Sequence, residues 1–198
     1  MHRTRHVILA AALVWAQCIG PSAQTVPMAT SRAPRLSGLT PGSRVLLDAH
    51  NAYPENGQWA DRLERALSTG WPLAIEQDLV WQRNEATGQF ESLVSHGEPI
   101  TGTEPTLEQY FIARVQPVVE QALRENRRET WPIVTLNLDF KTNEPEHHQF
   151  IWNLLGRFEP YLVTAPRTRR IDDVAPMTSA PVLVLTGSND VQERTFHD

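Results

Sequence analysis

Two acidic residues stand two positions apart in an otherwise apolar stretch. The stretch is Leu73–Val80, and it carries Glu76 and Asp78. Side chains alternate between the two faces of a strand, so both carboxylates point the same way if the stretch is extended. Two carboxylates on one apolar face repel each other and are costly to take out of water. A divalent cation between them would remove that cost, because hard cations prefer oxygen ligands.

Histidine, acid and lysine side chains stand at the ends of three further predicted strands. His50 and His96 each end a short apolar stretch, and Asp139 lies two positions before Lys141 in another. A histidine can accept or donate a proton near neutral pH, and two of them beside acids favour acid–base catalysis. We therefore expect one pocket that holds a cation between acids, with histidines around it.

Strand-like and helix-like segments alternate along the chain and must position these residues. Strands are predicted at 44–50, 73–80, 90–96, 133–141, 161–163 and 182–186. Helices are predicted at about 57–69, 106–125 and 145–156. This alternation is typical of a mainly parallel α/β sheet. The carboxyl ends of parallel strands form the active-site edge of such a fold, and polar residues on inner faces favour a barrel.

The order of the motifs resembles the superfamily of glycerophosphodiester phosphodiesterases and phospholipase C-like phosphodiesterases. The matching segments are Ala49-His50-Asn51-Ala52, Pro54-Glu55-Asn56, Glu76-Gln77-Asp78, Val94-Ser95-His96-Gly97 and Asp139-Phe140-Lys141. The resemblance covers about residues 44 to 141 and implies a TIM-type (β/α)8 barrel. Such a barrel usually takes about 250 residues, so we expect an incomplete barrel of about six strands in this chain.

The resemblance also assigns roles to the matching residues. It implies that His50 and His96 are the general base and general acid. The implied ligands of Ca²⁺ or Mg²⁺ are Glu76, Asp78 and Asp139. Lys141 would contact the phosphate. Asn51 stands where the family usually has arginine, so the contact with the substrate differs there.

The implied function is a secreted, metal-dependent phosphodiesterase that acts on glycerophosphodiesters or phospholipid head groups. A divalent cation neutralises the anionic ester, one histidine removes a proton from the nucleophile, and the other protonates the leaving alkoxide. The nucleophile is either water or a hydroxyl group of the substrate, and the latter would give a cyclic phosphate. We expect transient contact with a membrane surface and no obligate protein partner.

Structural interpretations compete with these roles. Glu76 and Asp78 could pair with arginines, the two histidines could be ordinary hydrogen-bonded side chains, and Asp139 with Lys141 could be a simple ion pair. The chain would then be a non-catalytic or degenerate barrel, a binding protein or a truncated fragment of the same fold.

Four further residues are predicted to be structural. His147 and His148 fall in the first turn of a predicted helix and are expected at the surface. Trp59 and Trp152 lie at helix-facing positions and are expected in the core.

The first residues have the layout of a secretory signal peptide. Arg3 and Arg5 precede the apolar run Val7–Ala16, and small residues follow, which predicts cleavage near residue 23. A linker is expected over residues 24–43 and the phosphodiesterase-like domain over 44–198. We therefore expect a secreted or periplasmic protein.

The charge of the chain limits its partners. The net charge of −5 would become −7 on removal of residues 1–23, which hold two arginines and no acid. An acidic protein of this kind is a poor general nucleic-acid binder. A phosphate-bearing substrate would need local positive charge from a metal or from a lysine or arginine.

Overall fold

The computed structural model describes residues 47–55, 57–168 and 175–197 of the 198-residue chain. The signal peptide expected over residues 1–23 and the linker expected over 24–43 lie outside the described residues.

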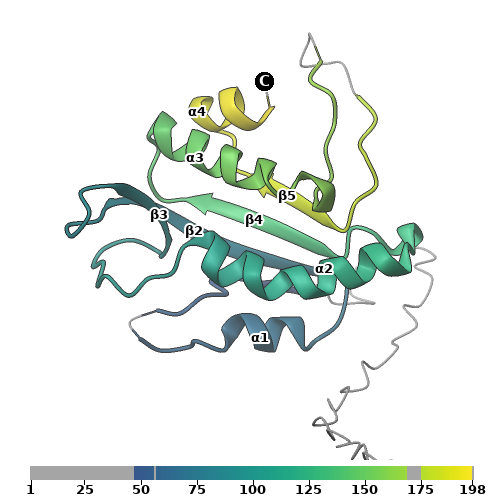
Figure 1. Ribbon diagram of the computed structural model, residues 1–198, viewed down its shortest axis with the longest axis horizontal. Helices are drawn as coiled ribbons and strands as arrows, with labels where there is room; N and C mark the ends of the chain where they lie inside the picture. The colour runs from purple at the N-terminus through teal and green to yellow at the C-terminus, as the bar shows by residue number, and fades with distance from the viewer. Residues whose placement is uncertain (1–46, 56, 169–174, 198) are drawn as a thin grey trace, which may run out of the picture. The chain divides into compact units, whose positions relative to one another are not determined.

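The described residues form a mixed α/β fold around one five-stranded sheet (Figure 1). Its strands are β1 Asp48–Ala49, β2 Leu73–Arg83, β3 Phe90–Val94, β4 Val134–Phe140 and β5 Val182–Thr186. Four strands run parallel in the order β1-β2-β4-β5, and β3 pairs antiparallel with β2 as a hairpin. The predicted parallel α/β sheet is therefore present, and over the described part of the chain it is not closed into a barrel.

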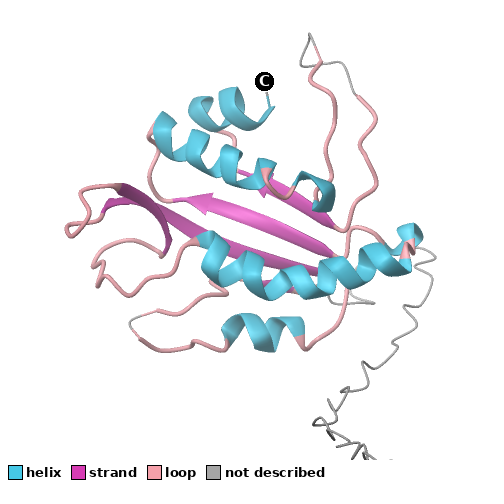
Figure 2. Cartoon of the chain, in the orientation of Figure 1, coloured by secondary structure: helices cyan, strands magenta, loops and turns pink. Residues whose placement is uncertain are grey.

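The helices follow the strands in the predicted alternation (Figure 2). They are α1 Arg62–Leu67, α2 Ala113–Glu125, α3 Pro145–Gly156 and α4 Asp190–Gln192. A π-helical turn at Glu108–Ile112 leads into α2, and a second one at Glu193–His197 follows α4. Two short 3-10 turns lie at Arg128–Thr130 and Glu159–Tyr161. No helix in the described part of the chain is long and apolar enough to span a membrane.

The long helical segment begins with a capping box formed by Thr106 and Gln109. The backbone N–H of Gln109 donates to Thr106 Oγ1 at 3.3 Å, and the backbone N–H of Thr106 donates to Gln109 Oε1 at 3.2 Å. These two bonds satisfy donors that the first helical turn leaves without intrahelical partners.

The two faces of the sheet differ in chemistry. Along β4, Leu136 and Leu138 are buried, whereas Thr135 and Asn137 between them are partly exposed. The apolar face packs against both α2 and α3, whose side chains line one small apolar cavity with Leu136. On the polar face Leu185 of β5, the register partner of Asn137, stays 46% exposed. The alternation of side chains along β4 therefore separates an apolar face of the sheet from a polar one.

Two predictions about local structure are wrong. The predicted strand at 161–163 is instead the 3-10 turn Glu159–Tyr161, followed by a single bridge from Leu162 to β5. Pro160 lies in the first turn of this 3-10 segment, where its missing N–H is tolerated. Trp59 and Trp152 are each 49% exposed, not core residues. Trp59 lies beneath the guanidinium groups of Arg62 and Arg65, and Trp152 lies against Phe196.

The prediction that His147 and His148 lie at the surface is also wrong, because both are fully buried. The ring of His147 is hydrogen-bonded to Ser92 Oγ at 2.7 Å and to Thr142 Oγ1 at 2.9 Å. His148 Nε2 lies 3.1 Å from Asn143 Oδ1. Buried polar rings need such partners, and these come from β3 and from the loop after β4, which the local sequence does not reveal.

Burial makes the stability of this fold depend on pH through His147. Burial, followed by the charge of neighbouring His148, lowers the pKa of His147 from 6.5 to about 3. As the pH falls, the unfolded chain therefore takes up the proton first, and stability is lost between pH 6.5 and 3. We expect the free energy of unfolding to fall by about 2 kcal/mol from pH 7 to pH 5 through this group.

Urea unfolding at both pH values measures this loss. In His147→Gln the pH-dependent part of the loss should shrink by that amount, whatever the absolute stability of the variant. An unchanged pH dependence in the variant would assign the acid sensitivity to other groups. Burial also lowers the pKa of His148, so this residue adds to the loss of stability at low pH.

Candidate functional site

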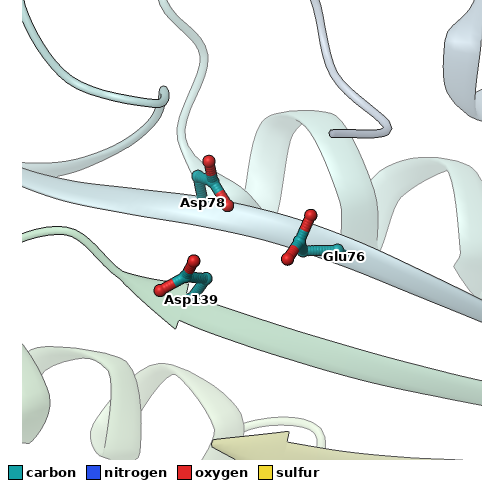
Figure 3. A group of neighbouring side chains, drawn as sticks. All are labelled: Glu76, Asp78 and Asp139. Atoms are coloured by element: carbon teal, nitrogen blue, oxygen red, sulfur yellow. The ribbon is translucent and has the colours of Figure 1, made fainter. Parts of the chain in front are cut away.

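Three carboxylates gather between β2 and β4 (Figure 3). Glu76 and Asp78 come from β2, and Asp139 comes from β4, where it is the register partner of Asp78. Each side chain offers one oxygen, and these oxygens all lie within 4.8 Å of one another. The alternation of side chains along β2 and the parallel pairing of β2 with β4 together produce this cluster.

Burial is unequal within the cluster. Asp78 is fully buried, Glu76 is 8% exposed, and the side chain of Asp139 is 45% exposed. Asp78 Oδ1 has no hydrogen-bond partner among the described residues. A buried carboxylate oxygen without a partner is costly, so the cluster has a coordination position that a cation could fill.

Tyr53 holds the other oxygen of Asp78. Its hydroxyl group donates to Asp78 Oδ2 at 2.6 Å and lies 3.1 Å from Asn51 Oδ1. Burial, the hydrogen bond to Asp78 and the neighbouring carboxylates raise the pKa of Tyr53 far above its usual value. The hydroxyl group therefore stays protonated and acts as a donor. Sequence reasoning missed Tyr53, because no spacing rule relates a loop tyrosine to an acid 25 residues later.

Lys141 supplies the positive charge of the cluster. Its Nζ lies 2.6 Å from Asp139 Oδ2 and 3.2 Å from Asp78 Oδ2. Burial acts to lower the pKa of Lys141, but the two carboxylates outweigh it and raise the pKa above its usual value. Three carboxylates and one ammonium group leave a formal charge of −2, which matches a divalent cation.

The turn after β1 brings His50 and Asn51 to the rim. His50 Nε2 lies 3.2 Å from Glu76 Oε2, and the backbone N–H of Asn51 donates to the same oxygen at 3.0 Å. The side chain of His50 is 71% exposed, so its other ring nitrogen can reach a bound molecule. Asn51 has a φ of +49°, a left-handed conformation that asparagine tolerates better than most residues. Arg62 Nη1 donates to the carbonyl of Asn51 at 3.2 Å and holds this turn.

His96 lies next to the site, just after the end of β3. The N–H of the preceding residue, Ser95, donates to the carbonyl of Asp78 at 3.0 Å, which places the end of β3 beside the cluster. The ring of His96 is exposed, and no hydrogen bond joins it to the described residues. The structure thus joins six predicted site residues in one network of contacts, part of which runs through Tyr53: His50, Asn51, Glu76, Asp78, Asp139 and Lys141. The seventh, His96, follows the end of β3 beside this network.

Comparisons of this chain with protein-family models, with curated proteins and with solved structures give no match. The function is therefore inferred from the chemistry of the site.

The bond from Tyr53 to Asp78 should contribute measurably to stability. We expect Tyr53→Phe to lower the free energy of unfolding by about 1–3 kcal/mol, because a buried carboxylate loses a donor. Tyr161→Phe is a matched control, since its hydroxyl group donates at 3.1 Å to the exposed Glu120. Urea unfolding of both variants measures the difference. Equal losses in the two variants would contradict the role given to Tyr53.

Proposed function

We propose that this protein is a metal-dependent phosphodiesterase that hydrolyses glycerophosphodiesters or phospholipid head groups. The observation that carries the proposal is the buried, unpartnered Asp78 Oδ1 inside a cluster of three acids with a histidine on its rim. The same residues occur in the order that the phosphodiesterase resemblance requires.

The donor set fits Ca²⁺ or Mg²⁺. Glu76, Asp78 and Asp139 offer only carboxylate oxygens, which are the ligands that these hard cations prefer. A divalent ion would balance the formal charge of the cluster. When bound, the ion would supply charge neutralisation for the phosphodiester and orient it.

The residues on the rim would move the protons. Glu76 Oε2 contacts His50 Nε2, which orients the ring and leaves Nδ1 to take a proton from the attacking hydroxyl group. His96 would protonate the leaving alkoxide. Lys141, whose side chain is 24% exposed, would contact a phosphate oxygen. Asn51 would contact the substrate in the place of the family's arginine. The nucleophile is either water or a hydroxyl group of the substrate.

We also propose that this sheet is part of a TIM-type barrel. Two features support this. The helices α2 and α3 lie on the same face of the sheet, as they do outside a barrel. The acids lie on the other face, where Leu185 stays 46% exposed, as on an inner wall that further strands would cover.

Localisation and partners are proposed from the same sequence patterns. The basic and apolar N-terminus supports secretion or export to the periplasm. A phospholipid substrate would require transient contact with a membrane surface. The acidic net charge argues against nucleic acid as a partner.

A non-catalytic protein of the same fold is the competing proposal. It is favoured by Lys141, which pairs with both Asp78 and Asp139 and so partly compensates their charge without a metal. Titration with metal ions and an assay of hydrolysis separate the two functions.

Metal binding is expected at the cluster. Isothermal titration with Ca²⁺ and with Mg²⁺ should show one site, and Glu76→Gln or Asp139→Asn should weaken it by at least about 10-fold. Glu129→Gln removes an acid from an exposed 3-10 turn and should bind as the parent does. If all variants bind alike, the ions attach elsewhere on this acidic protein.

Activity is tested with bis(p-nitrophenyl) phosphate and with glycerophosphocholine. Hydrolysis should stop in EDTA and return with the metal. His50→Ala should lower kcat/KM by about 10²–10⁴-fold through loss of the general base. Asp61→Asn, an exposed residue of the loop before α1, is the control and should retain activity. Hydrolysis that persists in EDTA and is unchanged in His50→Ala would reject the enzyme and leave the binding protein.

A further inference from the structure

An aromatic pair lies on the face of β2 opposite the acids. Trp81 is three residues beyond Asp78 and therefore points to the side that α3 covers, where it contacts His147 and Phe150. Phe90, at the start of β3, stacks on Trp81 with ring centroids 5.5 Å apart and planes inclined by 19°. Phe90 is 51% exposed, so this pair presents an aromatic surface to solvent.

Buried groups pack against Trp81 on the side of the core. The ring of His147 stacks on Trp81 at 5.2 Å, and its two nitrogens are fixed by Ser92 and Thr142. The backbone N–H of Trp81 also donates to Thr142 Oγ1 at 2.9 Å. Burial keeps the pKa of His147 at about 3, so the ring beneath Trp81 carries no positive charge at neutral pH.

Two carboxylates stand beside this aromatic surface. Trp81, Phe90, Glu144 and Glu146 line a hollow of about 320 Å³, next to the start of α3. Figure 1 shows the β2–β3 hairpin at the same end of the sheet as the start of α3. Both glutamates are exposed, and neither forms an ion pair with a described residue. Arg83, which shares this face of the hairpin, is directed instead at the carbonyl of Gly88, to which its Nε donates at 3.2 Å.

We propose that this hollow binds an organic cation of the trimethylammonium class. The faces of aromatic rings attract cations, and quaternary ammonium groups are weakly hydrated and favour such surfaces. The two glutamates form no ion pair with a described residue, and their charge exceeds the partial positive charge of the α3 N-terminus, so the hollow favours a cation. Phe90 and His147 both stack on Trp81, so the cation would lie against the exposed ring of Phe90 and beside the two glutamates. A trimethylammonium group is apolar enough for this contact, whereas a small metal ion would keep its water. The site is separate from the acid cluster and does not depend on the proposed phosphodiesterase activity.

The test uses the full chain and choline as the probe. Titration followed by the indole N–H resonance of Trp81 should show saturable binding of choline. The neutral isostere of choline, with carbon in place of nitrogen, should not bind measurably. Phe90→Ala, Glu144→Gln and Glu146→Gln should each weaken choline binding by about three- to fivefold. All three residues are exposed, so their replacement leaves the fold intact, which circular dichroism verifies.

Trp152→Leu is the matched control, because this aromatic residue is equally exposed on α3 and contacts Phe196, not Trp81. It should bind choline as the parent does. Three results would each overturn the proposal: no saturable choline binding, equal binding of the neutral isostere, or unchanged affinity in both glutamate variants. Loss of phosphodiesterase activity in EDTA bears only on the acid cluster, so the two proposals fail independently.

Vesicles of phosphatidylcholine distinguish a trimethylammonium group on a lipid from one on a free solute. If the protein sediments with the vesicles, if free choline displaces it, and if Phe90→Ala weakens this sedimentation, the site is assigned to a lipid head group. Choline binding without vesicle binding assigns it to a free solute.

Discussion

The burial of the Asp78 carboxylate is the constraint on which the site depends. A charged group with no exposed surface must find partners inside the protein, and Asp78 finds Tyr53 and Lys141 for one oxygen only. These partners come from the loop after β1 and from the end of β4, so the carboxylate ties three segments together. The remaining oxygen, Oδ1, keeps its desolvation cost, which is the physical reason for proposing a cation at this point.

Strand β2 contributes to both the acid cluster and the aromatic surface at Trp81, because its side chains alternate between the two faces of the sheet. Its even-numbered residues Glu76 and Asp78 face the acid cluster, while Leu79 and Trp81 face the core and α3. The strand is the longest of the sheet and pairs with three others, so its position is held on both edges. A change of register by one residue would move the carboxylates into the apolar core, and burial therefore also specifies the pairing.

The candidate site was predicted from the sequence more completely than its surroundings. Period-two alternation and the rule that parallel strands end at one edge were enough to expect Glu76, Asp78 and Asp139 together. The predictions of burial were wrong where the environment of a side chain is formed by segments distant in the sequence. His147 and His148 have the sequence position of surface residues, yet Ser92 of β3 and the loop after β4 bury and bind them. Trp59 has the type of a core residue, yet arginines of α1 hold it at the surface.

The sequence by itself determined the alternation of strands and helices outside residues 161–163, the apolar and polar faces of β4, and which residue types could bind a cation. These are local properties, because propensity and periodicity act over a few residues. Only the tertiary structure decided that Tyr53 and Lys141 share Asp78 Oδ2, that Oδ1 lacks a partner, and that Trp81 and Phe90 lie beside two glutamates. Those facts depend on contacts between residues far apart in the chain, whose distances no local pattern specifies.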